Sequence, residues 1–175
     1  MISEKMQGLL NEQFHRELLS ANQYLAISSY FEEEELDGFA HFFRLQAQEE
    51  LGHAMKQFDY LHQVDGKVEM ESIPKPETNF GGLVEVFEFT LEKERYITAS
   101  ISSIMKAAVE ENDFATQTFL MWFVQEQVEE EALVNNILRK LRMIGDNSSA
   151  LFLLNEELGR RKPEAEATQD IAGAI

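Results

Sequence analysis

The stretch QEELGH, residues 48–53, decides how this chain is organised. It lies in the middle of a segment whose apolar residues recur in steps of three and four, which predicts an amphipathic helix over about residues 38–64. Glu50 and His53 are one helical turn apart and fall on the apolar face of that helix. A buried carboxylate without a partner is costly or stays protonated. Something in the core must therefore offset negative charge.

Length and composition narrow the classes of protein that need to be considered. The chain has 175 residues, which suits a single domain with a sizeable core. Its net charge of −17 argues against nucleic acid and against an anionic membrane surface as partners, and it favours attraction of cations. The absence of cysteine excludes disulfides, zinc knuckles and rubredoxin-type iron sites. We see neither a signal peptide nor an apolar run long enough to span a membrane, so we expect a soluble, cytoplasmic protein.

Three further segments show the same apolar periodicity over enough residues for long helices, and a shorter segment follows them. Their expected ranges are 3–34, 83–111, 113–144 and, for the short segment, 150–158. The expected helix caps are Ser3, Asp37 and Asp113 at N-termini, and Gly145 after the fourth helix. Because the first two helices are joined by a short connection, as are the third and fourth, each pair should be antiparallel.

Residues 65–82 form the exception to this helical pattern. They contain Pro74, Pro76 and several glycines, and no apolar stripe persists through them. A loop of this length can return along the whole bundle, so the third helix could run parallel to the second. We therefore expect an all-α four-helix bundle with one long crossover loop and a short fifth helix. We assign residues 1–160 to this one domain and expect residues 161–175 to be a mobile tail.

Each of the four long helices carries polar residues near the middle of its apolar face. Because they lie near the helix midpoints, they share one level of the bundle whichever way each helix points. The second helix also carries Gln46 and Gln57 on this face. The candidate site residues at this level are Glu17, Glu50, His53, Glu94, Gln127 and Glu130.

Four clustered carboxylates raise one another's pKa and cannot all stay ionised unaided. The set includes no lysine or arginine that could neutralise them as ion pairs. Two divalent cations would balance four carboxylates, and an oxygen-rich site with an imidazole favours iron or manganese over zinc or copper(I). One glutamate on an apolar face is usually a register error or a snorkelling side chain, but that explanation would have to apply four times at the same depth.

The set resembles the ferritin-like di-iron carboxylate class, whose bundles carry such glutamates and Glu-x-x-His pairs on facing helices. Within that class, residues 3–160 resemble the bacterial non-haem ferritins. The motifs that carry the resemblance are Asn11-Glu12-Gln13, the stretch 48–53, the stretch EQVEEE at residues 126–131, and the short last helix.

The resemblance implies a ferroxidase centre with defined ligands. The first iron would be held by Glu17, Glu50 and His53. Glu50 would bridge to a second iron held with Glu94 and Glu130, with Gln127 nearby. A third iron site would be formed by Glu49, Glu126 and Glu129, and Tyr24 would be the tyrosine beside the centre. The resemblance further implies oxidation of iron(II) by dioxygen or hydrogen peroxide, and storage of ferric mineral inside a 24-subunit homo-oligomeric cage.

Two positions depart from related patterns. Gln127 replaces the second histidine of the two-histidine form, which predicts a weaker and more exchangeable second iron site. Leu51 follows the bridging glutamate where the haem-binding relatives carry a methionine, so we expect no haem.

Three alternatives remain open at this point. The chain could be a di-iron oxidase acting on an organic substrate, although bulky phenylalanine and leucine residues fill the helix faces. It could be an acidic bundle that sequesters metal without catalysis. It could also be a mini-ferritin, whose metal site is shared between subunits; that option leaves the four central carboxylates of this one chain unexplained.

Overall fold

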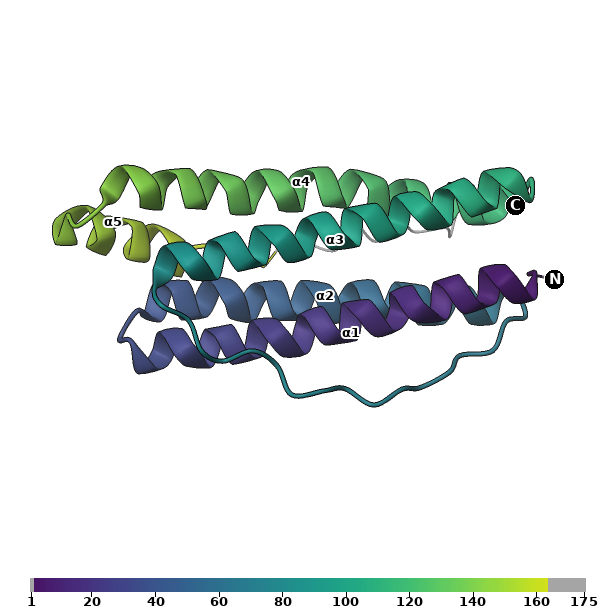
Figure 1. The fold of residues 1–175 in the computed structure, drawn as a ribbon, viewed down its shortest axis with the longest axis horizontal. Helices are drawn as coiled ribbons and strands as arrows, with labels where there is room; N and C mark the ends of the chain where they lie inside the picture. The colour runs from purple at the N-terminus through teal and green to yellow at the C-terminus, as the bar shows by residue number, and fades with distance from the viewer. Residues whose placement is uncertain (1, 164–175) are drawn as a thin grey trace.

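The structure, a computed structural model, describes residues 2–163, and every regular element in that range is helical (Figure 1). Four long helices form the bundle and a short fifth helix lies at one end, which confirms the predicted all-α fold. Within the described range no helix is both long and apolar enough to cross a membrane. The helices are α1 (Glu4–Glu33), α2 (Asp37–Gln63), α3 (Leu83–Glu110), α4 (Phe114–Ile144) and α5 (Ser148–Gly159).

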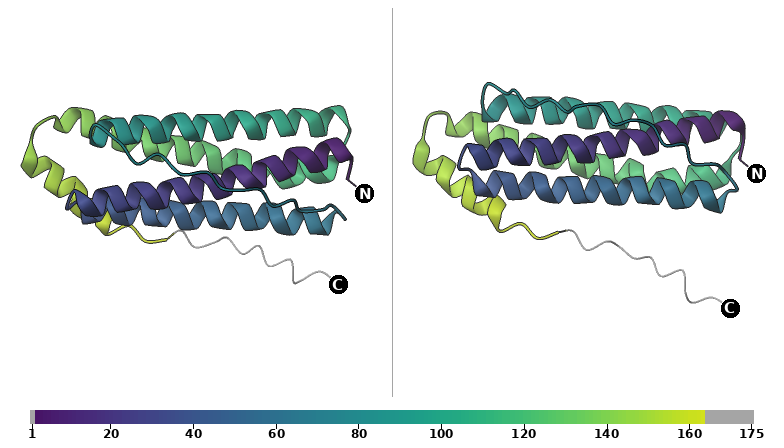
Figure 2. Two further views of the ribbon diagram at one scale, coloured as in Figure 1. Left: turned by 60° about the horizontal axis from the view of Figure 1, so that its bottom comes forward. Right: turned by 90° about the horizontal axis from the view of Figure 1, so that it is seen from below.

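The long crossover makes α3 run in the same direction as α2, as the loop length allowed (Figures 1 and 2). Two amide side chains of α1 fasten this loop. Asn11 Nδ2 donates to the carbonyl of Lys67 at 2.8 Å, and Asn11 Oδ1 accepts from the Glu69 amide at 2.7 Å. Gln23 forms the same reciprocal pair with both backbone groups of Glu77, at 2.8 and 2.9 Å. The loop therefore follows α1 as an ordered strap.

Two apolar clusters fill the two ends of the bundle. Aromatic side chains dominate the end near α5, whereas aliphatic side chains dominate the other end. The polar residues predicted at the helix midpoints lie between these clusters and are buried. Phe31, Phe39 and Phe87 represent the first cluster; Leu10, Leu61 and Ile104 represent the second.

Three predicted helix ends agree with the structure, and one N-cap was wrong. Ser3 and Asp113 accept hydrogen bonds from the amides of Met6 and Thr116, at 3.0 Å each, and Gly145 ends α4 with φ of +52°. Asp37, by contrast, is the first residue of α2 and does not cap it; Leu36 holds the N-cap position and forms no side-chain cap.

The side chain of Asn155 in α5 supplies the missing cap of α2. Its Oδ1 accepts from the amides of Gly38 and Phe39 at 2.9 and 3.2 Å. A Cβ built on Gly38 would lie only 1.8 Å from the Asn155 carbonyl oxygen. The absence of a side chain at residue 38 therefore lets α5 approach the start of α2.

We expect Gly38→Ala to lower the free energy of unfolding by about 3 kcal/mol, because the methyl group would force α5 off the α2 amides. Thermal unfolding of the apo protein measures this as a fall in Tm of several degrees. Gly8→Ala is the control: it is exposed in α1 with nothing within 4 Å of the added Cβ, and alanine favours a helix over glycine. A Gly38→Ala protein as stable as the Gly8→Ala protein would contradict this account.

Candidate metal centre

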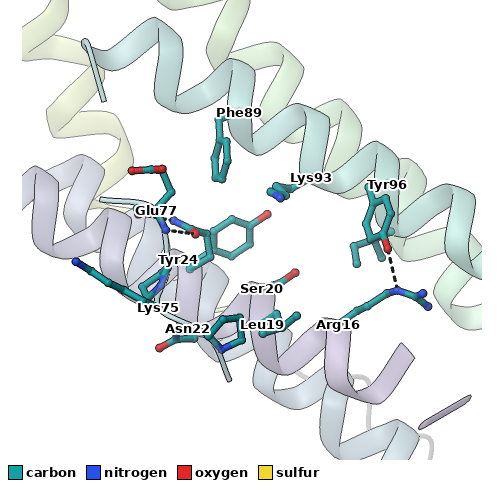
Figure 3. A pocket seen from close by; sticks show the side chains of 14 residues that line it. Arg16, Leu19, Ser20, Asn22, Tyr24, Lys75, Glu77, Phe89, Lys93 and Tyr96 are labelled. Atoms are coloured by element: carbon teal, nitrogen blue, oxygen red, sulfur yellow. Dashed lines mark hydrogen bonds between the residues drawn. The ribbon is translucent and has the colours of Figure 1, made fainter. Parts of the chain in front are cut away.

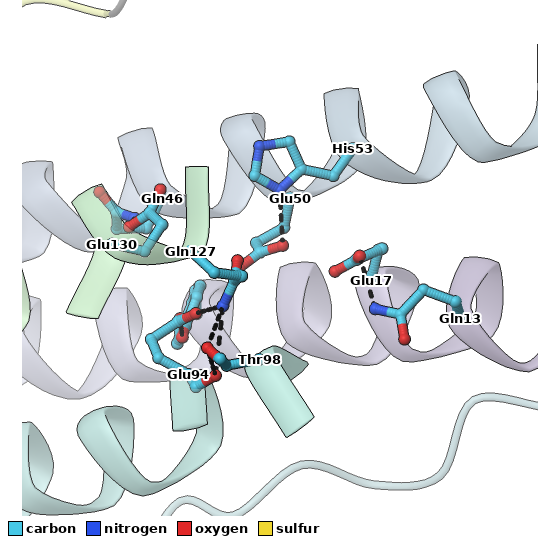
Figure 4. A network of polar contacts seen from close by, with 10 residues as sticks. Gln13, Glu17, Gln46, Glu50, His53, Glu94, Thr98, Gln127 and Glu130 are labelled. Carbon is cyan, nitrogen blue, oxygen red and sulfur yellow. Dashed lines mark hydrogen bonds and ion pairs between the residues drawn. The ribbon is translucent and has the colours of Figure 1, made fainter. Parts of the chain in front are cut away.

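One carboxylate of α1 and two side chains of α2 meet in the middle of the core. Glu17, Glu50 and His53 each offer one ligand atom, and these atoms lie within 4.8 Å of one another (Figure 4). His53 Nδ1 lies 3.2 Å from Glu50 Oε2. All three residues are buried, because the 3-residue spacing in α2 directs Glu50 and His53 toward α1. The three residues predicted to hold the first iron are thus brought together.

Glu94 of α3 and Gln127 of α4 lie on the other side of Glu50 (Figure 4). Gln127 Nε2 donates to Glu94 Oε2 at 3.2 Å and to the Glu94 carbonyl at the same distance. The Tyr24 hydroxyl donates to the other oxygen, Glu94 Oε1. Glu130, one turn after Gln127, is buried at the same level. Glu94 and Glu130 lie beside Glu17, Glu50 and His53, but within residues 2–163 those three residues form the one group of three or more potential ligands whose atoms all lie within 4.8 Å of one another.

Burial and mutual repulsion raise the pKa of the central carboxylic acids. Desolvation raises the pKa of Glu17 and of Glu50 well above the ordinary value, and the charges of Glu94 and Glu130 add to the effect at Glu50. Desolvation and the charge of Glu94 raise the pKa of Glu130 to about 8. The pKa of Glu94 is raised by desolvation, while hydrogen bonds from Tyr24 and Gln127 offset part of that rise. The surrounding residues therefore provide too little positive charge to keep all four carboxylates ionised.

The donor set fits a divalent metal ion. Within the described part of the chain, no lysine or arginine forms an ion pair with Glu17, Glu50 or Glu94. Within residues 2–163, no N–H or hydroxyl donor lies within hydrogen-bond distance of the buried Glu17 Oε2, although the other oxygen of Glu17 accepts from Gln13. Carboxylate oxygens with one imidazole are the ligands that iron and manganese favour. A metal ion would satisfy both this Glu17 oxygen and the excess negative charge.

Tyr24 lies between this centre and the outside of the bundle. Its hydroxyl reaches Glu94, while its ring lines a pocket of about 450 Å³ bounded by α1, α3 and the crossover loop (Figure 3). Its pKa is raised well above the ordinary value by burial and by the charge of Glu94, so the phenol keeps its proton at neutral pH. Only 1% of Tyr24 is exposed, and the ring separates the pocket from the carboxylates.

The residues predicted for a third iron lie outside the cluster of Glu17, Glu50 and His53, although the charge of Glu49 raises the pKa of both Glu50 and Glu130. Glu49 and Glu126 are half-buried and Glu129 is exposed on α4. Glu49 Oε1 is 3.5 Å from Arg161 Nη2, and Glu129 accepts from Gln125 at 3.4 Å. Within residues 2–163 these three carboxylates do not form a group of close ligand atoms as Glu17, Glu50 and His53 do. The third site stays a prediction.

Three residues around the centre had no role assigned from the sequence. Gln13 and Gln46 donate hydrogen bonds to Glu17 and Glu130, and Arg161 donates to Gln46. A signal was available for Gln13, which precedes Glu17 by four residues on the same helical face. No local signal exists for Arg161, which was assigned to the tail predicted to be mobile; residues 164–175 of that tail lie outside the described residues.

Comparison with known proteins gives one consistent answer. A family model described as "Ferritin-like domain" matches residues 7–144. The chain is similar to the bacterial non-heme ferritin of Campylobacter jejuni, with 41% identity over 89% of this chain and 93% of that protein. It is also 42% identical to that of Bacteroides fragilis, over 92% of this chain and 100% of that protein.

Solved structures agree with these sequence relatives. An open-pore ferritin from the archaeon Archaeoglobus fulgidus superposes with a TM-score of 0.91, at 42% identity over 93% of this chain and 100% of that chain. A structure described as a humanized archaeal ferritin gives a TM-score of 0.92 at 43% identity, over 93% of this chain and 98% of that one. The matched segment 7–144 contains all four long helices apart from the first residues of α1, and hence every residue of the buried centre. The chain belongs to the ferritin family.

Proposed function

We propose that this protein stores iron and acts as a ferroxidase, oxidising iron(II) at a two-metal centre inside each chain. The observation that carries the proposal is the buried cluster of Glu17, Glu50 and His53, flanked by the buried carboxylates of Glu94 and Glu130. Family membership supports the same function, because the curated relatives are named non-heme ferritins.

In this proposal the metal ions are substrates, and the side chains bind and orient them. Glu17, Glu50 and His53 hold the first iron(II), and Glu50 shares its carboxylate with a second ion held by Glu94 and Glu130. Gln127 stays close to Glu94, to which it donates. Each iron(II) loses one electron, so a pair supplies the two electrons that reduce dioxygen to hydrogen peroxide, or hydrogen peroxide to water.

Raised carboxyl pKa values couple metal binding to proton release. At neutral pH the centre retains protons that two divalent cations must displace, because the cations and the protons compete for the same oxygens. Glu130, whose pKa is raised to about 8, is one ligand that must release a proton before it can bind a cation at neutral pH. Affinity for the second ion should therefore rise as the pH rises toward 8.

Storage requires an assembly, and the chain offers surface for one. Ferritins are its structural neighbours, which supports homo-oligomeric assembly, and we propose a 24-subunit cage. Phe152 and Leu153 of α5 are 62% and 68% exposed, and Met143 at the end of α4 is 87% exposed. Apolar side chains gathered at one end of the bundle suit contact with other copies. A cytoplasmic location stays a prediction.

The test begins with light scattering and size exclusion on the purified apo protein, followed by iron(II) in air on the same sample. A cage of about twenty-four chains that oxidises hundreds of ions per cage and keeps them soluble supports storage. A monomer or dimer that takes up about two ions per chain and stops would contradict storage. That outcome would favour the alternative, a di-iron oxidase acting on an organic substrate.

Glu129→Ala tests the predicted third site separately from the buried pair. Because Glu129 is exposed and lies outside the buried cluster, we expect the first turnover, with two iron(II) ions per chain, to keep its wild-type rate. Later turnovers should slow severalfold. Stopped-flow absorbance at two and at ten ions per chain measures both phases; an abolished first turnover would make Glu129 a primary ligand.

A further inference from the structure

Two buried glutamines lie on opposite sides of Glu50, and each donates to one carboxylate of the centre (Figure 4). Gln13 Nε2 lies 2.7 Å from Glu17 Oε1. Gln46 Nε2 lies 2.8 Å from Glu130 Oε2. Gln13 is fully buried and Gln46 is 1% exposed, so water does not compete for these bonds. Each glutamine thus occupies one oxygen of a proposed ligand and leaves the other oxygen for a metal ion.

The opposite end of each amide is held by a chain of donors that ends in a guanidinium. Gln46 Oε1 accepts directly from Arg161 Nη1. Gln13 Oε1 accepts from the Ser100 hydroxyl, which in turn accepts from Arg16 Nη1 at 2.9 Å. These donors fix the orientation of both amides. A rotated Gln46 would turn its carbonyl toward the Glu130 carboxylate and its N–H groups toward a guanidinium, and both contacts are repulsive.

Contacts with α2 hold Arg161 in place. Its backbone carbonyl lies 2.9 Å from His41 Nε2 on α2, and its guanidinium lies 5.2 Å from the centre of the Phe42 ring. Just before it, α5 buries Leu154 and Leu158 in the core. Together with the Asn155 cap on α2, these contacts deliver a residue from the end of α5 to the edge of the metal centre.

We propose that Gln13 and Gln46 are positioning residues that set the affinity of the two metal ions separately, and that Arg161 acts through Gln46. Gln13 would orient Glu17 for the first ion, and Gln46 would orient Glu130 for the second. This inference rests on the proposed two-metal function. The geometry at Glu17 agrees with it, since within residues 2–163 no N–H or hydroxyl donor reaches the oxygen that Gln13 does not occupy.

The physical basis is pre-organisation of the ligands. A carboxylate held by one oxygen presents the other in a fixed direction, whereas an unheld carboxylate must lose rotational freedom when the metal binds. Loss of a hydrogen-bond partner behind a metal ligand typically weakens binding by about 10- to 100-fold. Because the two glutamines contact different carboxylates, their loss should affect different ions.

Anaerobic titration of the apo protein with Co²⁺, followed by its visible absorption, tests this without any oxidation. We expect Gln46→Met to weaken the second Co²⁺ by about tenfold and to leave the first within about twofold. Gln13→Met should show the reverse. Equal weakening of both ions in both variants would mean that the glutamines only support the fold, and would overturn the inference.

Substitution of Arg161 tests the inference a second way, without changing either glutamine. Its side chain lies at the outer end of the chain of donors, so its loss should not prevent folding. Arg161→Met should reproduce the Gln46→Met effect, and Arg161→Lys should restore much of the affinity. The double variant should be no weaker than either single variant, because both changes break one connected unit. Arg160→Met is the control, since Arg160 is exposed and pairs with Glu156.

The outcomes separate this inference from the proposed function. If Arg161→Met bound Co²⁺ like Arg160→Met, the role of Arg161 would be wrong even with two ions bound per wild-type chain. A wild-type chain that bound a single Co²⁺ would contradict the two-metal function. In that case the Gln13→Met variant would still decide whether a buried glutamine positions the ligand of the bound ion.

Discussion

Glu50→Gln should lower the initial rate of iron(II) oxidation by at least about 100-fold, which corresponds to about 2.7 kcal/mol of transition-state stabilisation. Glu50 lies between the two halves of the centre, close to Glu17 and His53 on one side and coupled to Glu94 and Glu130 on the other. The amide keeps the shape of the side chain but removes its charge and one anionic oxygen. Both ions should therefore lose a ligand in a single substitution.

Stopped-flow absorbance after mixing iron(II) with aerated apo protein measures the change. Glu92→Gln serves as the matched control, because it removes one charge from an exposed position of α3, two residues from Glu94. We expect the control to oxidise iron at the wild-type rate, and we expect both variants to remain folded by circular dichroism. Wild-type oxidation by Glu50→Gln would show that the buried cluster is not the site of reaction.

The apo protein should be more stable at pH 5.5 than at pH 8.5. Burial raises the pKa of Glu130 from 4.5 to about 8, so between these values the folded chain holds a proton that the unfolded chain has released. Its stabilising contribution is complete below about pH 4.5 and is lost as the pH rises through 8. This one residue accounts for up to about 5 kcal/mol on the linkage relation. The raised pKa values of Glu17 and Glu50 act in the same direction.

Glu130→Gln should therefore raise the Tm of the apo protein at pH 8.5, by about 10 °C, and flatten its dependence on pH. The general repulsion of a chain with net charge −17 also destabilises it as the pH rises. Glu129→Gln is the control for this general repulsion, since it removes the same charge from the exposed neighbouring position. Calorimetry of the wild-type, Glu130→Gln and Glu129→Gln apo proteins at pH 5.5 and 8.5 measures these Tm values. Equal Tm values for the two variants would contradict the claim that the buried Glu130 carboxylate destabilises the fold when it is ionised.

At pH 8.5, addition of Co²⁺ should give the wild-type protein a higher Tm than Glu130→Gln, which reverses the order expected for the two apo proteins. A ligand that binds only the folded state stabilises it, and the wild-type centre binds the ions more tightly than a centre without Glu130. The same substitution would thus stabilise the apo protein and destabilise the metal-bound one. That reversal distinguishes a metal ligand from a carboxylate that is merely badly placed.

Local spacing accounts for most of what the sequence predicted correctly. The boundaries of the five helices and the burial of Glu17, Glu50 and Glu94 follow from steps of three and four residues. The failure at Asp37 has a non-local cause, because Asn155, more than 100 residues away, caps α2 in its place. Within residues 2–163 the predicted third-site residues form no comparable cluster: Glu49 and Glu126 are half-buried and Glu129 is exposed.

The sequence by itself determined that four helices would each bring a carboxylate to one level of the core, since helix periodicity fixes the face and the midpoint fixes the depth. Only the tertiary structure decided which oxygen of Glu17 and of Glu130 accepts a hydrogen bond from a glutamine and which is left for a metal ion. Gln46 meets Glu130 across 84 residues and Arg161 meets Gln46 across 115. Such contacts depend on the rotation of each helix about its axis and on where α5 docks. Neither quantity is encoded in the spacing of residues along a single helix.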